Sequence, residues 1–282
     1  MMKNIALYKY CFLTKKCTQL PLPENINNID DLVISLSSGV YTTIRIYKQS
    51  KVLYFQAHLG RLKDSLALSG ISIGYGLNDI RKPIRDIVTK FCEQDLRIRI
   101  HIPLEYPDVC YLIQEFLSPY PESIYATGVK VKTNQLSREN PKAKLTEFIS
   151  ASIKEKECMK RLGLEESLII GPNQEILEGL TSNFFGIKGD DVYTAMEMVL
   201  DGITRSIVLR IIQESGFHTV LKPVNFNDIN FLDECFITST SRGVLPVIQI
   251  DDIHIGNGLP GKKTMQIRKE FLALINSELE FI

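Results

Sequence analysis

The stretch Leu177-Glu178-Gly179-Leu180-Thr181-Ser182-Asn183-Phe184-Phe185 places a carboxylate directly before a glycine and small polar residues, at the start of an apolar strand. Taken alone, it indicates only a turn in which Glu178 lies at the surface and residues 181–183 satisfy nearby backbone groups. Residues 201–205 form a second glycine turn, Asp-Gly-Ile-Thr-Arg, ahead of an amphipathic helix. Free backbone N–H groups at that helix start could bind a phosphate, although a plain turn explains these residues equally well.

The composition is that of an ordinary globular protein. A chain of 282 residues exceeds the usual size of one hydrophobic core, which favours two domains. Lysine plus arginine and aspartate plus glutamate both number 33, so no nucleic-acid partner is expected. The apolar runs are too short to span a bilayer and the first ten residues lack a signal-peptide core, so we predict a cytoplasmic protein without a membrane partner. Six scattered cysteines without a CxxC pair predict reduced thiols, and no metal site is predicted.

The hydrophobic pattern predicts an α+β fold. Strands are expected at residues 40–47, 51–55, 96–102, 109–116, 129–133, 167–170, 183–187, 234–240 and 244–250, and helices at 57–68, 78–92, 147–162, 202–214 and 264–276. Residues 117–128 carry two prolines and a glycine among polar residues, which is typical of a linker. We therefore predict a small N-terminal domain of residues 1–119, a linker of residues 120–128 and a larger C-terminal domain of residues 129–282.

Several segments together resemble the class IV family of aminotransferases and lyases that depend on pyridoxal 5′-phosphate (PLP). The likeness covers about residues 35–270, and its elements are the strand 39–45, the His-Leu-Gly-Arg-Leu stretch 58–62, a lysine some thirty residues before Glu178-Gly179, the turn 202–205 and the stretch 240–247. The resemblance implies a fold-type-IV enzyme with two α/β domains and the cofactor in the cleft between them. It also implies a homodimer.

By this resemblance, Lys144 forms the Schiff base with PLP, and Lys142 is the alternative. Such a lysine must lose its proton, which requires a partly desolvated site that lowers its pKa. Glu178 would bond the pyridine nitrogen and keep it protonated. The same lysine would remove the proton from the substrate Cα.

The resemblance also assigns residues to the cofactor phosphate. Arg61 would bind two phosphate oxygens through its planar guanidinium. Backbone N–H groups of Ile203 and Thr204 and the hydroxyl of Thr240 would complete the phosphate site.

For the substrate, the resemblance implies that the backbone turn at Ser241 and Arg242 receives the carboxylate, with Tyr41 lining the pocket. The Arg242 guanidinium could select a second acidic group on the substrate. The alternative is an ordinary arginine that points outward.

The implied function is transamination between a small amino acid and a 2-oxo acid. The pair Thr42-Thr43 is closer to aminodeoxychorismate lyases, which eliminate pyruvate and yield 4-aminobenzoate with the same cofactor and lysine. D-amino acid aminotransferases are a further option, but residues 99–101 do not clearly reproduce their carboxylate-binding stretch. A non-catalytic PLP-binding homologue would dispense with Lys144 or Glu178, and this chain has both.

Overall fold

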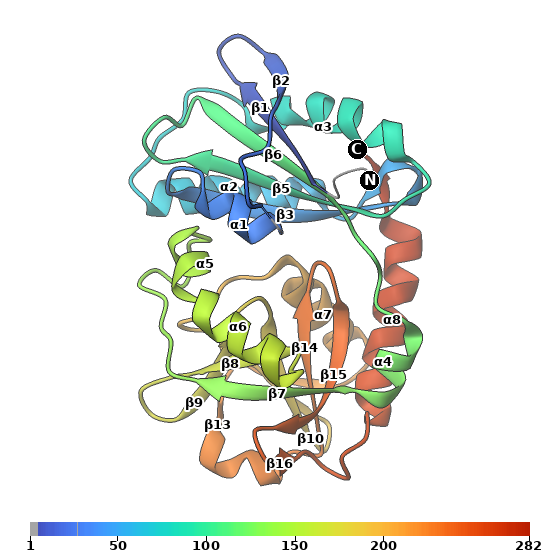
Figure 1. Ribbon diagram of the computed structural model, residues 1–282. Helices are drawn as coiled ribbons and strands as arrows, with labels where there is room; N and C mark the ends of the chain where they lie inside the picture. The colour runs from blue at the N-terminus through green and yellow to red at the C-terminus, as the bar shows by residue number, and fades with distance from the viewer. Residues whose placement is uncertain (1–4, 27) are drawn as a thin grey trace. The chain divides into compact units, whose positions relative to one another are not determined.

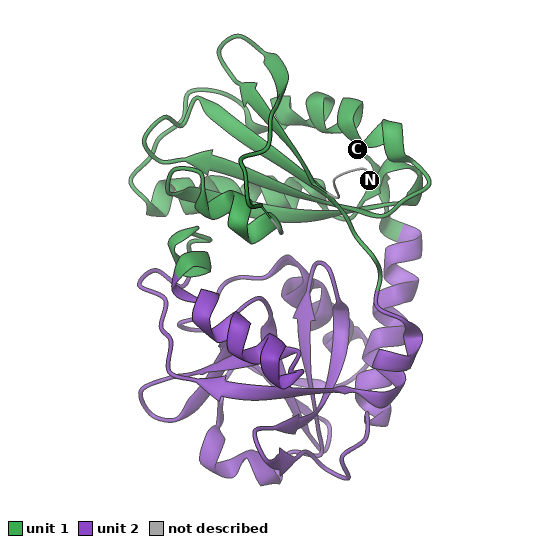
Figure 2. Cartoon of the chain, in the orientation of Figure 1, with its two compact units in different colours: residues 1–119, 142–150, 278–282 green, residues 120–141, 151–277 purple. Residues whose placement is uncertain are grey.

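The computed structural model describes residues 5–26 and 28–282 and divides into two compact units. Unit 1 comprises residues 1–119, 142–150 and 278–282, and unit 2 comprises residues 120–141 and 151–277 (Figure 2). The chain thus enters unit 2 at residue 120 and returns to unit 1 twice. The sequence prediction placed all of residues 129–282 in one C-terminal domain and did not foresee these returns. Pairing explains both returns, because Leu145 forms a β-bridge with Val40 and the strand at residues 280–281 pairs with residues 51–52.

Unit 1 is built on an antiparallel sheet whose described strands follow the order β17-β4-β3-β5-β6-β1-β2 (Figure 1). The strands are β1 Ile5–Cys11, β2 Lys16–Leu20, β3 Gly39–Tyr47, β4 Lys51–Val52, β5 Leu96–Pro103, β6 Val109–Phe116 and β17 Glu280–Phe281. The helices are α1 Ile29–Ile34, α2 Phe55–Leu68, α3 Arg81–Val88 and α5 Glu147–Ala151, with 3-10 turns η1 Lys48–Ser50, η2 Leu77–Ile80 and η3 Thr89–Phe91.

Alternation along β3 decides which side chains meet the helices of unit 1. Val40, Ile44 and Ile46 are buried in one core with the apolar stripes of α2 and α3, and each such side chain contributes about 2 kcal/mol. Tyr41 lies in a second core with α1, because successive strand residues point to opposite faces of the sheet. Thr42 therefore lies on the face that α2 covers.

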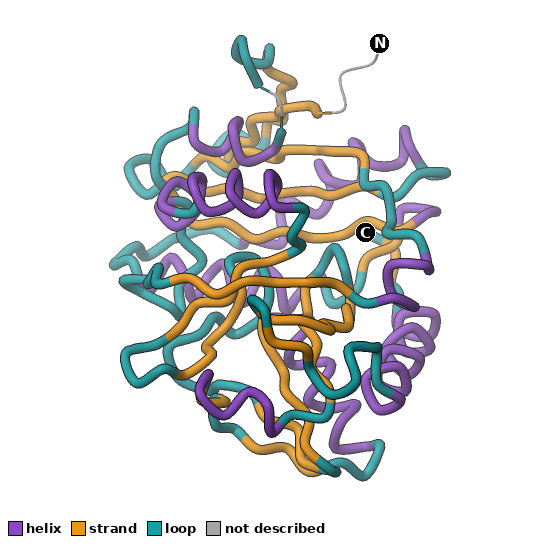
Figure 3. The backbone as a smooth tube through the Cα atoms, turned by 60° about the horizontal axis from the view of Figure 1, so that its bottom comes forward, coloured by secondary structure: helices purple, strands orange, loops and turns teal. Residues whose placement is uncertain are grey.

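Unit 2 contains a sheet of order β12-β11-β10-β14-β15-β7-β8-β9-β13, with β16 beside β15. Figure 1 labels most of these strands, and Figure 3 draws the strands of the chain in orange from another side. Pairing of Asn183 on β10 with Glu178 on β9 closes six of these strands into a ring. The strands are β7 Val129–Asn134, β8 Glu166–Ile170, β9 Glu175–Gly179, β10 Asn183–Lys188, β11 Asp191–Tyr193, β12 His218–Val220, β13 Val224–Asn225, β14 Glu234–Ser239, β15 Gly243–Ile250 and β16 Ile253–His254. The helices are α4 Glu122–Thr127, α6 Ile153–Leu162, α7 Ile203–Glu214 and α8 Lys262–Glu278, with the 3-10 turn η4 Phe226–Phe231.

The structure differs from the sequence prediction in two segments that matter for the division of the chain. Residues 120–128 were expected to be a linker, but they hold α4, which begins after Pro121 and ends at Gly128 with φ +72°. Proline and glycine here bound a helix, as they commonly do. The helix predicted at residues 147–162 is two helices, α5 and α6, interrupted at Ser152.

Candidate active site

In unit 1, β3 and α2 bring three polar side chains together. Arg61 donates from Nη2 to Thr42 Oγ1 at 2.8 Å, and the same hydroxyl lies 3.2 Å from Nδ1 of His58. Burial, and then the charges of Arg61 and Lys144, lower the pKa of His58 well below its ordinary value. His58 is therefore neutral near pH 7, and the positive charge of this cluster rests on Arg61 and Lys144.

Lys144 is fixed at both of its main-chain groups. Its carbonyl oxygen accepts from the N–H of Tyr41 at 2.9 Å, and its own N–H donates to Ser65 Oγ at 3.1 Å. Its Nζ lies 4.8 Å from the centroid of the Tyr41 ring. The alternative, Lys142, lies two residues earlier in the same segment and is half-buried. The predicted residues Tyr41, Arg61 and Lys144 thus meet within unit 1.

In unit 2, Glu178 lies near the end of β9 and is only 2% exposed. Its Oε2 accepts from Asn183 Nδ2 at 3.1 Å and from the N–H of Leu200 at 3.1 Å, and its Oε1 lies 2.8 Å from Nε of Arg138. The alternative that places Glu178 at the surface of a turn is therefore wrong. A buried carboxylate requires such partners, because burial removes its hydration.

The glycine turn before α7 contacts the same asparagine. Helix α7 begins at Ile203 with Gly202 as its N-cap, and no side chain caps it. A Cβ atom at Gly202 would lie 2.1 Å from Asn183 Oδ1, so only glycine fits there. The first hydrogen bond within the helix runs from Ser206 N–H to Gly202 carbonyl. The N–H groups of Ile203 and Thr204 thus lack intrahelical acceptors and can serve an anion.

The turn between β14 and β15 carries Thr240, Ser241 and Arg242. Thr240 and Ser241 are half-buried, whereas Arg242 is 8% exposed. Arg242 donates from Nη2 to Glu166 Oε2 at 2.8 Å and from Nη1 to Glu165 Oε1 at 3.1 Å. The alternative of an outward-pointing arginine is therefore wrong. The selection of a second substrate acid by this guanidinium stays a prediction, although two protein carboxylates already bind it.

The sequence prediction missed four residues that bind the predicted site residues. They are Thr42, Arg138, Glu166 and Asn183. Thr42 carried a signal, since it is a polar residue on the strand face that its neighbours make apolar. Asn183 lies within the stretch 177–185, where it was expected only to satisfy nearby backbone groups. Arg138 lies in an irregular segment and Glu166 in an acidic pair, and neither position differs in pattern from a solvated charge.

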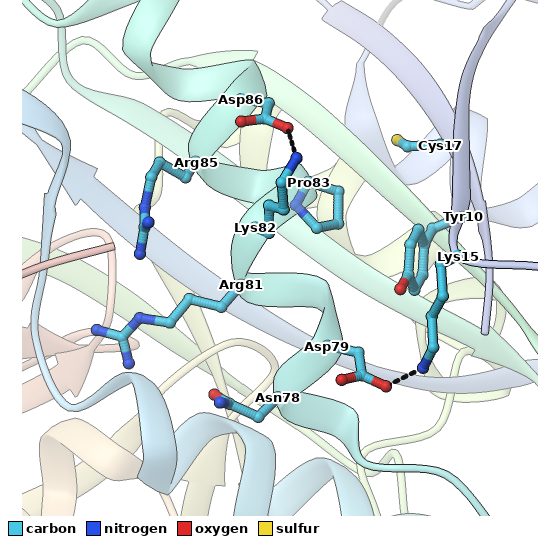
Figure 4. A pocket seen from close by; sticks show the side chains of 10 residues that line it. All are labelled: Tyr10, Lys15, Cys17, Asn78, Asp79, Arg81, Lys82, Pro83, Arg85 and Asp86. Atoms are coloured by element: carbon cyan, nitrogen blue, oxygen red, sulfur yellow. Dashed lines mark hydrogen bonds and ion pairs between the residues drawn. The ribbon is translucent and has the colours of Figure 1, made fainter.

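Figure 4 shows a pocket of about 610 Å³ in unit 1, whose lining includes none of the predicted site residues. It is lined by Tyr10, Lys15, Cys17, Asn78, Asp79, Arg81, Lys82, Pro83, Arg85 and Asp86. Lys15 pairs with Asp79, and Lys82 pairs with Asp86. Arg81 and Arg85 both bind backbone oxygens of the 281–282 segment. The cations of this pocket are therefore engaged in holding unit 1 together.

Comparison with known proteins now identifies the class. Residues 39–250 match the family described as amino-transferase class IV, and the chain belongs to this family. It is 25% identical to a branched-chain-amino-acid aminotransferase of Pseudomonas aeruginosa, over 86% of this chain and 85% of that protein. It is 26% identical to a D-alanine aminotransferase of Bacillus licheniformis, over 89% of this chain and 92% of that protein.

Solved structures support the same fold. The branched-chain aminotransferase of Thermoproteus uzoniensis, solved with norvaline, matches with a TM-score of 0.77 at 20% identity, over 97% of this chain and 96% of that chain. The predicted α+β, fold-type-IV architecture is thus confirmed, and the chain is a class IV aminotransferase. In the part of the chain that the structure describes, no helix has both the length and the apolar character needed to cross a membrane.

Proposed function

We propose that this chain binds PLP and transfers an amino group between a small amino acid and a 2-oxo acid. The observation that carries the proposal is the position of Asn183, which contacts both the buried carboxylate of Glu178 and the uncapped start of α7 at Gly202. An anionic carboxylate and a set of N–H donors suit a ligand that has a basic ring nitrogen and a phosphate. PLP has both groups.

In this proposal, each predicted residue would bind one part of the cofactor. Lys144 would hold its aldehyde carbon, and Glu178 would bond its ring nitrogen. Arg61, the N–H groups of Ile203 and Thr204, and the hydroxyl of Thr240 would bind its phosphate. When bound, PLP supplies an electron-accepting ring that stabilises the negative charge left on the substrate Cα.

The chain's own residues would then orient the substrate and move its proton. The Nζ atom of Lys144 would accept the Cα proton, which requires that the amine be neutral for part of the cycle. The neutral state of His58 adds no third positive charge to the cluster of Arg61 and Lys144. The contacts of Lys144 with Tyr41 and Ser65 support it over Lys142 as this residue.

For the substrate carboxylate, we propose the backbone at Ser241 and Arg242, with Tyr41 lining the pocket. The names of the relatives make branched-chain amino acids and D-alanine the first donors to test. The relatives reported above are aminotransferases, and none of them supports pyruvate elimination.

The proposal also includes a homodimer in the cytoplasm, on the resemblance alone. Light scattering of the purified protein would test the homodimer, and localisation of a tagged chain would test the cytoplasmic location.

Absorption spectroscopy tests the proposal. Protein reconstituted with PLP should show a visible band, Lys144→Ala should lose it, and Lys142→Ala should keep it. Leucine, valine, isoleucine and D-alanine are then supplied with 2-oxoglutarate, and each donor's oxo acid is measured. Loss of the band in Lys142→Ala alone would transfer the covalent role to Lys142. Absence of a band in wild type would refute PLP binding.

A further inference from the structure

A carboxylate that the proposed mechanism does not use lies fully buried beside the β9–β10 turn. Glu166, the first residue of β8, is 0% exposed. Its Oε2 accepts from the hydroxyl of Thr181 at 2.6 Å and from the hydroxyl of Ser182 at 2.9 Å. Both donors belong to the turn that joins Glu178 to Asn183. One carboxylate therefore fixes the turn on which the presentation of Glu178 depends.

The same oxygen of Glu166 also accepts from the β14–β15 turn. Nη2 of Arg242 donates to it at 2.8 Å and also lies 2.7 Å from Thr181 Oγ1. Nε of Arg242 donates to Ser239 Oγ at 3.1 Å, and the carbonyl of Arg242 accepts from the hydroxyl of Tyr125 at 2.8 Å. Arg242 is thus held at both its side chain and its backbone. The two residues that precede Arg242 in the chain are Thr240 and Ser241.

The chain is closely packed where β9 enters the β9–β10 turn, at Gly179. The N–H of Gly179 donates to the carbonyl of Ser182 at 2.8 Å. A Cβ atom at Gly179 would lie 2.4 Å from Ser182 Oγ and 2.7 Å from Cγ of Glu166. Close packing of this kind transmits a shift of Glu166 directly to the turn.

The charges of the pair stabilise each other in the buried environment. Burial by itself would raise the pKa of Glu166, but the charge of Arg242 and the hydroxyl of Thr181 outweigh it, and the pKa is lowered. Burial would likewise lower the pKa of Arg242, but Glu166 and Glu165 raise it. Both groups are therefore charged across the physiological range.

We propose that Glu166 and Arg242 are positioning residues that hold the turn that follows Glu178 and the turn that carries Thr240 and Ser241 in one fixed arrangement for the cofactor. This inference rests on the proposed function. Two separate loops must present their groups to one ligand, and a shared buried ion pair couples them within unit 2. A break in the pair would release both turns at once, whereas an isolated structural pair would affect stability alone.

Three variants test the proposal. Arg242→Met removes the ion pair. Thr181→Val removes one of the two turn hydroxyls that bind Glu166, the one that Arg242 also contacts. Lys263→Met is the control, because Lys263 also forms an ion pair in unit 2, with Asp190 at 2.7 Å, and that pair binds neither of the two turns. For each apoprotein, the dissociation constant for PLP is measured by titration, together with the pH dependence of the bound cofactor's visible band and thermal unfolding.

The positioning role predicts weaker PLP binding by about tenfold or more in Arg242→Met, the loss that one charge-assisted hydrogen bond carries. It predicts a smaller loss of affinity in Thr181→Val and a shifted pH dependence of the band in both variants. It predicts PLP binding within about twofold of wild type in Lys263→Met. Where Arg242→Met does not fold, Thr181→Val decides. Wild-type affinity and an unchanged pH dependence in the folded variants would overturn the positioning role while leaving the proposed function intact. Wild-type protein that binds no PLP would overturn both.

Discussion

Glu166→Gln is expected to destabilise the protein, and its effect should depend on pH. The carboxylate is 0% exposed, so water cannot compensate when its charge is removed and the guanidinium of Arg242 loses its nearer partner. Breaking a buried ion pair in this way costs about 3–5 kcal/mol. Glu165 still faces Arg242 at 3.1 Å, which places the expected loss near the lower end, about 3 kcal/mol.

The pH dependence follows from the direction of the pKa shift. The folded protein lowers the pKa of Glu166 below its ordinary value of 4.5, because Arg242 and Thr181 outweigh the opposing effect of burial. The stability that the carboxylate contributes is therefore fully present above pH 4.5 and is lost as the pH falls toward the folded pKa. The difference between wild type and Glu166→Gln should accordingly be largest near neutral pH and shrink below pH 4.5.

Urea unfolding followed by circular dichroism at pH 7 and again below pH 4.5 measures both differences. Glu122→Gln is the control, since its carboxylate side chain is 78% exposed and its removal from Arg268 should cost no more than about 1 kcal/mol. The double variant Glu166→Gln/Arg242→Met should recover part of the loss, because it leaves no unpaired buried charge. A deficit equal at both pH values, or none at pH 7, would refute the reasoning.

Three further outcomes are expected. Glu178→Gln should lower kcat by about a hundredfold or more in steady-state assays, because an amide cannot keep the ring nitrogen protonated, and Glu178→Asp should restore part of it. Gly202→Ala should weaken PLP binding in a dissociation-constant titration, because its Cβ would lie 2.1 Å from Asn183 Oδ1, whereas Gly76→Ala, in open space at φ −85°, should bind PLP normally. Burial lowers the pKa of His101 to about 4 from 6.5, so the folded protein loses stability relative to the unfolded chain as the pH falls from 6.5 toward 4. In His101→Gln, the free energy of unfolding, measured in urea, should therefore depend less on pH across that range.

Local pattern predicted the elements whose apolar residues recur with a regular period. The strand β3 was predicted because Val40, Ile44 and Ile46 fall on one strand face, and α7 because its apolar residues recur on one helix face after a glycine. The strand β2, by contrast, is almost wholly exposed at the edge of its sheet, so its residues carry no period that the sequence could reveal. The short helix α4 was taken for a linker because its bounding proline and glycine are equally typical of loops.

The predicted site residues came from a family resemblance, and the residues that support them came from the fold. Arg138 and Glu178 are 40 positions apart in sequence, and only the ring of strands in unit 2 brings their side chains to 2.8 Å. Arg242 illustrates the opposite case, since its place in the motif was recognised but its partners, Glu165 and Glu166, were not. A charge that the fold buries cannot be distinguished by sequence pattern from one that faces water.

Arg61 and Lys144 make the cluster in unit 1 cationic, whereas Glu178 in unit 2 is a buried carboxylate. This difference bears on whether the chain is an active enzyme or a passive binder of PLP. Phosphate binding alone would require Arg61 and the start of α7, and it would leave no reason to bury a carboxylate with three partners at Glu178. Burial of that charge costs free energy that only its partners or a ligand can offset. In the proposed function, the ring nitrogen of PLP would be such a ligand, and its protonation matters only when electrons flow into the ring. Because Arg138, Asn183 and Leu200 already bind Glu178, burial alone does not decide its role. The Glu178→Gln variant does, since an active enzyme should lose kcat with it whereas a passive binder has no turnover to lose.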